Sequence, residues 1–333
     1  MSLVVSQNLS VYDTDGASTA LACTDLVDVA LKTNLGTIVT AMCVFGRYVP
    51  MSVINGVLTG RITATLGMHL CPAVVTFQDI ESFTALCERY RDFPNMIVEL
   101  VAPVFEAVSN IIMANKGTID KYIGDCIMSF WQVGVGGPAM ACCHAVQALL
   151  ESLSVEPASD ERSPRGGSLI RFRSGAHFGE TLLGNFGSCA RFNYTVIGDV
   201  VNTAARMEPL NKEVHSRTLI SEDVFSEIPS EHALKAHLRY VGTYALIGKA
   251  LPMRVYELQN EAMDGTAHAQ WHSMMVMVDK GDFVGALAIL DLAMKAMDPG
   301  RDAVAEELVL MMTTLRSERN AEPWDGVRKQ RKK

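Results

Sequence analysis

The sequence predicts an α+β sandwich in which helices cover one face of a sheet. Three observations carry this prediction. Strand-like and helical runs alternate from residue 73 to 258, the stretch GTIDKYIGDCIMSF at 117–130 has the pattern of a β-hairpin, and the pattern beyond Gln259 is wholly helical. We therefore expect an N-terminal segment at 1–44, a central domain at 45–259 and a helical extension at 260–333.

The composition is that of a globular protein. The chain has 333 residues, of which 49% are hydrophobic and 20% are charged, and its formal net charge is −8. An acidic chain matches nucleic acid poorly, so we expect no nucleic-acid partner. The eight cysteines form no CxxC pair, and the N-terminus lacks the pattern of a signal peptide, which favours a reduced, cytoplasmic location.

The N-terminal segment ends in a short apolar stripe. Between Leu31 and Val49 the apolar residues are spaced alternately by four and three, as in a two-helix coiled coil. Gly36 interrupts the stripe, so packing of this helix against the same chain is an equal alternative. Residues 1–44 do not resemble a complete sensor, and we expect an upstream sensor or a regulatory partner.

The elements of the central domain follow in order. A strand at 73–80 precedes a helix near 95–115, the hairpin and a helix near 139–153, and the later strand-like runs are LIRFRSGAHFG, TLLGNFG and FNYTVIG. The uncharged stretch at 133–150 contains three glycines and a proline. We interpret it as a strand end, a loop and a buried helix, and we expect no transmembrane segment.

The remaining segments are a loop and a helical hairpin. Residues 154–168 have the composition of a polar loop. Beyond Gln259, two helices joined at Pro299 and Gly300 precede the basic stretch RKQRKK at 328–333. We expect this stretch to be a frayed tail, with a membrane-surface or import signal as the alternative.

Two acidic residues stand where predicted strands end. Asp125 lies at the bend of the hairpin after Gly124, and Asp79 ends the strand that leads into a helix near Ser82. Each is either an ordinary solvated turn residue or a ligand for a cation. Paired carboxylates suit hard divalent ions, and the free amides at a helix start attract phosphate. The pattern thus leaves a metal site for phosphoryl or nucleotidyl transfer open.

A helix that follows Asp199 carries two polar residues on one side. Asn202 and Arg206 are four residues apart and therefore project together, away from an apolar stripe. The stripe consists of Val200, Ala204 and Met207. The polar side is either a solvated surface or a contact for a nucleotide, with the amide on the ribose and the guanidinium on a phosphate.

Four stretches in this order and spacing resemble the catalytic domain of class III nucleotidyl cyclases, and specifically of adenylate cyclases. They are FQDIESFT, GTIDKYIGDCIMSF, GAHFGETLLGNFGS and RFNYTVIGDVVNTAARME, within a similarity that extends from about residue 45 to 258. The resemblance implies a ferredoxin-like sandwich that forms a head-to-tail homodimer with active sites at the dimer interface.

The resemblance also implies roles for the acids and for the residues that recognise the base. Asp79 and Asp125 match the metal-binding aspartates, and the main-chain carbonyl of Ile80 is a further ligand for two Mg²⁺ or Mn²⁺ ions. Lys121 matches the lysine that recognises adenine. Thr195 occupies the second base-recognising position, where a large subgroup of the family has threonine.

Further roles concern the ribose and the phosphates. Asn202 matches the residue that orients the ribose, and Arg206 matches the arginine that stabilises charge on the α-phosphate. Backbone amides around Glu81 to Thr84, including those of Phe83 and Thr84, are placed to contact the terminal phosphates. Ile247 stands where the family commonly has a phosphate-binding lysine. Lys249, expected on the same strand face, is a substitute for it.

The implied reaction is the conversion of ATP into 3′,5′-cyclic AMP and pyrophosphate. A guanylate cyclase is disfavoured, because Lys121 donates hydrogen bonds whereas the N1 and N2 groups of guanine need an acceptor. A catalytically weak or silent nucleotide-sensing module is the other alternative, and the substitution at Ile247 permits it.

Overall fold

The computed structural model describes residues 34–44, 46, 48–63, 65–155, 170–188, 190–296, 302–317 and 324–330. Its contacts divide the chain into two compact units, Met1–Thr63 and Ala64–Lys333. The first unit contains the helix Asn34–Val44 and α2 (Met51–Leu58). The helix expected around 31–49 is therefore present over part of its length, and whether it forms a coiled coil stays a prediction.

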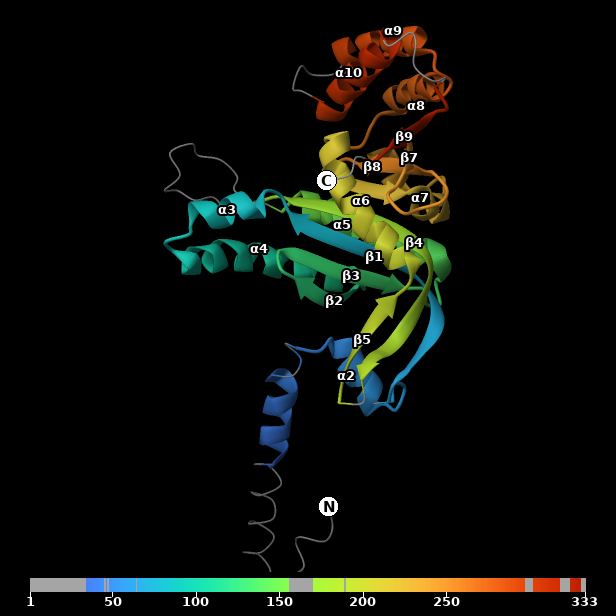
Figure 1. Cartoon of the computed structure of the whole chain (residues 1–333). Coiled ribbons are helices and arrows are strands. Elements are labelled where there is room, and N and C mark those ends of the chain that lie inside the picture. The colour runs from blue at the N-terminus through green and yellow to red at the C-terminus, as the bar shows by residue number, and fades with distance from the viewer. Residues whose placement is uncertain are drawn as a thin grey trace, which may run out of the picture. The chain divides into compact units, whose positions relative to one another are not determined.

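The second unit is built on a nine-stranded sheet (Figure 1). The strands are β1 (Gly67–Ile80), β2 (Thr118–Ile123), β3 (Cys126–Gln132), β4 (Phe172–Ser188), β5 (Arg191–Ile197), β6 (Thr218–Ser221), β7 (Leu238–Ala245), β8 (Met253–Leu258) and β9 (Val327–Lys329). Their order is β2-β3-β1-β4-β6-β8-β7-β9, and β5 pairs with β4 outside this row. The antiparallel part β2-β3-β1-β4, with helices after β1 and β3, is the predicted ferredoxin-like arrangement.

The helices include those expected after Ser82, near 95–115, near 139–153 and after Asp199. They are α3 (Phe83–Arg89), α4 (Pro94–Ala114), α5 (Gly137–Leu153), α6 (Asp199–Val214), α7 (Glu222–Glu227), the 3₁₀ turn η1 (Ala233–His237), α8 (Gly265–Asp279), α9 (Phe283–Ala296) and α10 (Ala303–Ser317). The stretch at 133–150 is a strand end, a loop and α5, as expected. Within the described residues, α4 is the one helix long and apolar enough to cross a membrane, and its buried residues belong to the core of this domain.

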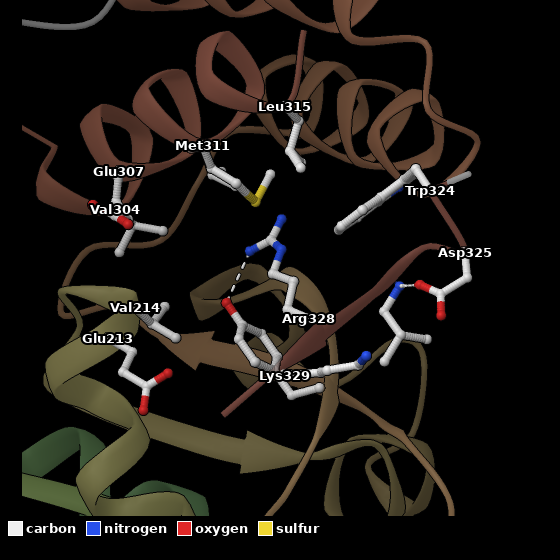
Figure 2. A pocket seen from close by; sticks show the side chains of 13 residues that line it. Glu213, Val214, Val304, Glu307, Met311, Leu315, Trp324, Asp325, Arg328 and Lys329 are labelled. Carbon is white, nitrogen blue, oxygen red and sulfur yellow. Dashed lines mark hydrogen bonds between the residues drawn. The ribbon is translucent and has the colours of Figure 1, made fainter. Parts of the chain in front are cut away.

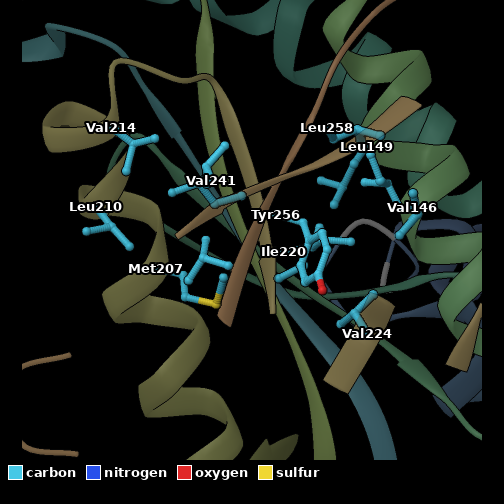
Figure 3. Packing of buried hydrophobic residues seen from close by; sticks show 14 of the residues in the cluster. Val146, Leu149, Met207, Leu210, Val214, Ile220, Val224, Val241, Tyr256 and Leu258 are labelled. Carbon is cyan, nitrogen blue, oxygen red and sulfur yellow. The ribbon is translucent and has the colours of Figure 1, made fainter. Parts of the chain in front are cut away.

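Both faces of the sheet are covered, which corrects the expectation of one helix-covered face. Val74 and Val75 of β1 lie in separate hydrophobic clusters because successive strand side chains point to opposite faces. The cluster of Val74 includes Ala145 of α5, and that of Val75 includes Ala204 of α6. Figure 3 shows part of the first cluster, in which Leu210 of α6 and Leu149 of α5 lie on either side of the strands.

Glycines let α6 lie close to β4. A Cβ atom at Gly175 would be 2.4 Å from the backbone nitrogen of Glu208, and one at Gly179 would be 2.9 Å from a methyl carbon of Val200. Contacts this short leave no room for any other residue type. The two glycines thus allow α6, which carries Asn202, to pack directly against the backbone of β4.

The C-terminal helices are tied to the sheet by a buried ion network. The guanidinium of Arg239 on β7, whose side chain is 1% exposed, pairs with Glu257 at 2.6 Å and with both carboxylate oxygens of Asp302 at 2.5 and 2.8 Å. The predicted helical pair is present as α9 and α10. Their junction at Pro299 and Gly300 lies outside the described residues, as does most of the predicted loop at 154–168.

The chain then returns to the sheet, so the expected frayed tail is wrong for residues 328–330. Strand β9 pairs in parallel with β7, and Arg328 donates hydrogen bonds of 2.8 Å to the carbonyl of Val241 and to the hydroxyl of Tyr244. Arg328 lines a cavity of about 370 Å³ bounded by α10, β9 and the end of α6 (Figure 2). Backbone pairing therefore orders a segment whose composition alone resembles a solvated tail.

Candidate active site

The turn between β2 and β3 brings the two acids together. Only Gly124 of the two turn residues has a positive φ, 64°, as in a type II′ hairpin turn, and Asp125 follows it. Asp79 pairs with Cys126 across β1 and β3, and the amide of Ile80 donates to the carbonyl oxygen of Asp125 at 3.3 Å. The predicted metal-binding residues Asp79, Ile80 and Asp125 are thus neighbours.

The two carboxylates disturb each other electrostatically. Burial, the charge of Asp125 and the hydrogen bond between the two carboxyl groups together raise the pKa of Asp79 to about 6, with burial as the largest cause. The positive charges of Arg173 and Lys212 lower that pKa without cancelling the increase. Two half-buried carboxylates held side by side are unfavourable unless a proton or a cation lies between them. The pair is therefore a suitable place for a positive ion.

The donor atoms fit Mg²⁺ or Mn²⁺. Carboxylate and carbonyl oxygens are the ligands that these hard ions prefer. Across the described residues, no cluster of three or more His, Cys, Asp and Glu side chains could hold a metal. Mg²⁺ sites commonly combine one or two carboxylates with water and substrate phosphates, so a pair of acids is a sufficient protein contribution.

Lys121 and Thr195 lie next to each other, as expected of residues that recognise one base. The ammonium of Lys121 donates to the hydroxyl of Thr195 at 3.3 Å, although the residues are 74 positions apart. Lys121 is 40% exposed and Thr195 is 4% exposed. The pair thus presents one flexible donor and one fixed hydroxyl.

A third residue, Asp120, supports this pair and was missed in the sequence. Its carboxylate, 1% exposed, lies 3.1 Å from the ammonium of Lys121 and accepts a short hydrogen bond from the hydroxyl of Thr195. The register of β2 and β3 shifts between Ile119 and Lys121, so Asp120 occupies an irregularity in the strand. Simple strand alternation would send neighbouring side chains to opposite faces.

Asn202 and Arg206 share a side of α6 that is not buried. Asn202 is exposed and Arg206 is partly exposed, whereas the apolar stripe on this helix is buried, as its spacing predicts. The turn after β7 packs against the guanidinium of Arg206. A Cβ atom at Gly248 would lie 3.1 Å from one of its nitrogens, and the φ of 74° there also favours glycine. This glycine leaves space beside the positive charge.

The surroundings of Lys249 differ from the prediction. Residues 246–249 form a turn closed by a bond from the amide of Lys249 to the carbonyl of Leu246 at 3.0 Å, so Lys249 does not share a strand face with Ile247. Its ammonium pairs with the carboxylate of Asp199 at the start of α6, and that contact lowers the pKa of Asp199. Binding of a phosphate by Lys249 would require exchange of this partner.

The start of α3 provides amides close to the acid pair in sequence. Ser82 has a left-handed φ of 59° and precedes the first helical residue, Phe83. The amide of Glu81 already donates to the carbonyl of Arg171 at 2.7 Å, which removes it from the expected phosphate-binding set. The contributions of Phe83 and Thr84 stay predictions.

Arg173 is a second site residue that the sequence did not single out. It pairs with Asp79 across β1 and β4, is 7% exposed and lies 3.3 Å from the carboxylate of Glu208. Its guanidinium places a positive charge close enough to Asp79 to lower the pKa of that carboxyl group. Its signal would have been the register of β4 against β1, which no local pattern gives.

The site residues fall into separate groups within one chain. Among the described residues, no hydrogen bond or ion pair joins Asp79 and Asp125 to Lys121, Thr195 or Arg206. The cations that lower the pKa of Asp79 are Arg173 and Lys212, and Lys121 is not among them. The acid pair Asp79 and Asp125 and the pair Lys121 and Thr195 thus share no hydrogen bond or ion pair, although Lys121 and Asp125 lie on one hairpin.

Comparisons with known proteins converge on one family. The family model of the adenylate and guanylate cyclase catalytic domain matches residues 70–260. Adenylate cyclase 1 of Rhizobium meliloti is 27% identical over 226 residues, which cover 66% of this chain and 32% of that protein. An adenylate cyclase of Anabaena cylindrica is 30% identical over 190 residues, covering 56% of this chain and 36% of that protein. The chain spans about a third of the length of these curated relatives.

The fold agrees with solved structures. A structure of a bacterial light-regulated adenylyl cyclase matches with a TM-score of 0.58 and 24% identity, covering 71% of this chain and 64% of that chain. At this level of identity the likeness concerns the fold.

Proposed function

Because the chain belongs to the family of adenylate and guanylate cyclase catalytic domains, as the match over residues 70–260 shows, we propose that it is an adenylate cyclase. The reaction is attack of the ribose 3′-oxygen on the α-phosphorus of ATP. A new oxygen–phosphorus bond closes the cyclic phosphate, the bond to the β-phosphate breaks, and the hydroxyl proton and pyrophosphate leave. The relatives named adenylate cyclases support this assignment.

The acid pair carries the proposal. Asp79 and Asp125, with the carbonyl of Ile80, would hold two divalent ions, for which Mg²⁺ and Mn²⁺ are the candidates. When bound, such ions lower the pKa of the attacking hydroxyl and offset the charge of the triphosphate. Arg173, beside Asp79, adds a fixed positive charge on the same side. The raised pKa of Asp79 in the metal-free protein is the observation that favours a cation here.

The remaining residues bind and orient the nucleotide. Lys121 would donate to the ring nitrogen N1 of adenine, and the hydroxyl of Thr195 would contact the 6-amino group. Asn202 would hold the ribose, and Arg206 would stabilise the negative charge that develops at the α-phosphate. Lys249 would reach the terminal phosphates after leaving Asp199.

We propose that each site is shared by two chains in a head-to-tail homodimer. One chain would supply the acid pair, and its partner would supply Lys121, Thr195, Asn202 and Arg206. The separation of these residues into independent groups within one chain is consistent with this arrangement. The cytoplasmic location and an upstream sensor or regulatory partner stay predictions.

The first test assays the purified chain with Mn²⁺ and either ATP or GTP. Cyclic AMP from ATP is the expected product. Cyclic GMP would show a guanylate cyclase, and the absence of both products, in a chain that still binds nucleotide, would favour a silent sensing module.

The second test mixes two inactive variants. Asp79→Ala and Arg206→Ala should each be inactive alone. A heterodimer of the two carries both lesions in one site and none in the other, so each heterodimer should recover at most about half of the wild-type rate by two-fold symmetry. Subunit exchange is confirmed with two affinity tags. Exchanged heterodimers that stay inactive would exclude the shared site.

A further inference from the structure

Asp120 is a buried carboxylate whose contacts all concern the base-recognising pair. Besides the ammonium of Lys121 at 3.1 Å and the hydroxyl of Thr195, its carboxylate accepts a long bond from the amide of Val196 at 3.4 Å. The side chain is 1% exposed. A carboxylate in such a place is expensive unless its partners are fixed. Asp120 therefore restricts the hydrogen bonds that Lys121 and Thr195 can make to a ligand.

We propose that Asp120 determines the base selectivity of the site by fixing the direction of the hydrogen bond made by Thr195. This inference rests on the proposed function and adds a positioning residue to it. A hydroxyl has one hydrogen to donate and two lone pairs that accept. An ionised carboxylate is an acceptor only, so the short bond between the two must use the hydrogen of Thr195.

The competing acceptor for this hydrogen is weaker. The carbonyl of Val196 lies 3.4 Å from the hydroxyl oxygen, a longer distance than the bond to Asp120, and it carries no formal charge. Charge-assisted hydrogen bonds are shorter and stronger than neutral ones. The hydrogen of Thr195 thus stays with Asp120, and the hydroxyl oxygen has only lone pairs to offer a ligand.

The same carboxylate leaves Lys121 as a donor. An ammonium has three hydrogens. The hydroxyl of Thr195 at 3.3 Å accepts one of them, and the ion pair with Asp120 at 3.1 Å holds the ammonium in place, so hydrogens remain that can be donated to a ligand. The pair together therefore presents one donor and one acceptor in a fixed order.

A donor at Lys121 and an acceptor at Thr195 complement the edge of adenine and mismatch the edge of a 6-oxopurine. Adenine has an acceptor at N1 and a donor at its 6-amino group, which complement Lys121 and Thr195. Hypoxanthine and guanine have a hydrogen at N1 and an acceptor at O6, so each would place donor against donor and acceptor against acceptor. Unpaired polar groups in a site of this kind discriminate strongly between substrates.

The test replaces Asp120 with asparagine, which keeps the shape of the side chain. The Nδ2 group of asparagine can donate to Thr195 and free the hydroxyl hydrogen to point at the base. We expect the ratio of kcat/KM for ATP to that for inosine triphosphate to fall by about tenfold or more, since each mismatched polar contact is worth that order of discrimination. Asp92→Asn, a loss of the same charge at an exposed position, should leave the ratio unchanged.

A double-mutant comparison separates this role from a general structural one. In a Thr195→Val background the hydroxyl is absent, so Asp120→Asn should cause no further change in the ratio. Thr195→Val alone should also weaken the preference for ATP, which tests the same bond if Asp120→Asn does not fold. An unchanged ratio in Asp120→Asn, or an equal change with and without the hydroxyl, would overturn the inference.

Binding without turnover distinguishes this inference from the proposed function. The analogues 3′-deoxy-ATP and 3′-deoxy-ITP lack the attacking hydroxyl, and their affinities can be measured by calorimetry in Mn²⁺. Preference for 3′-deoxy-ATP that is lost in Asp120→Asn would support the inference even if the wild type made no cyclic nucleotide. Equal affinities of the wild type for both analogues would refute it even if the chain were an active cyclase.

Discussion

Removal of the Asp79 charge is expected to stabilise the metal-free protein while it destroys the site. Burial and Asp125 raise the pKa of Asp79 from 3.8 to about 6. The folded state therefore binds a proton more tightly than the unfolded chain between those two pH values. The contribution of Asp79 to the free energy of unfolding is most favourable at low pH, where the group is protonated, and it declines as the pH rises towards 6. At neutral pH the ionised group destabilises the folded state by a constant amount. Asp79→Asn removes that penalty.

The magnitude follows from the pKa change. A shift of about two units corresponds to about 3 kcal/mol for a fully buried group. Asp79 is only half-buried, and solvent screening reduces the expected gain to about 1 kcal/mol. In a unit of this size the gain corresponds to an increase in Tm of about 3 °C at neutral pH.

The assay is thermal unfolding in EDTA and in Mn²⁺. In EDTA at about pH 7.5, where Asp79 is ionised because its pKa is about 6, Asp79→Asn should melt above the wild type. The difference should shrink as the pH falls below about 6. Adding Mn²⁺ should stabilise the wild type by ligand binding and should leave the variant nearly unchanged. Asp92→Asn controls for the loss of a negative charge. A variant that melts below the wild type in EDTA, or that gains as much from Mn²⁺, would refute the reasoning.

Other parts of the structure give further predictions. Asp302→Ala leaves the buried guanidinium of Arg239 with one acidic partner, so urea unfolding should show a loss of about 2–4 kcal/mol, and a loss below about 1 kcal/mol would contradict the network. Gln330 donates a hydrogen bond to the carbonyl of Arg206, the residue that we propose stabilises the charge developing at the α-phosphate. Gln330→Ala should therefore lower kcat several-fold with little change in KM for ATP, and a change confined to KM would count against this. Burial lowers the pKa of His177 to about 4, so on acidification the unfolded chain takes up this proton at a higher pH than the folded protein does. The free energy of unfolding should therefore decline by up to about 3 kcal/mol from pH 6.5 to 4. His177→Gln should lose that dependence, and an unchanged pH profile would exclude His177 as its source.

Local patterns in the sequence were sufficient for much of the fold and for parts of the site. The spacing of Asn202 and Arg206 predicted their common side of α6, because helix geometry alone fixes which residues share a face. The hairpin was predictable from Gly124, whose positive φ suits the tight turn that carries Asp125. These are properties of a few consecutive residues, so no partner strand had to be known.

The register between distant strands could not be predicted from local patterns in the sequence. Asp120 faces Thr195 because β2 is irregular between Ile119 and Lys121, and such an irregularity leaves no mark in the hydrophobic pattern. Arg173 reaches Asp79 only through the pairing of β4 with β1, which joins residues more than 90 positions apart. Both residues were missed for the same reason: their roles depend on pairings between distant segments.

Strand β9 shows how far this dependence extends. Three residues in a basic stretch have no periodicity, yet their pairing with β7 places Gln330 between two parts of the site. Its side chain donates to the carbonyl of Arg206 at 3.1 Å and accepts from the amide of Ile247 at 3.2 Å, and its own amide donates to Ala245 at 3.1 Å. The pattern changes at 259, but hydrogen bonding to the site continues to residue 330. The segment that follows the C-terminal helices is therefore hydrogen-bonded to the helix that carries Arg206.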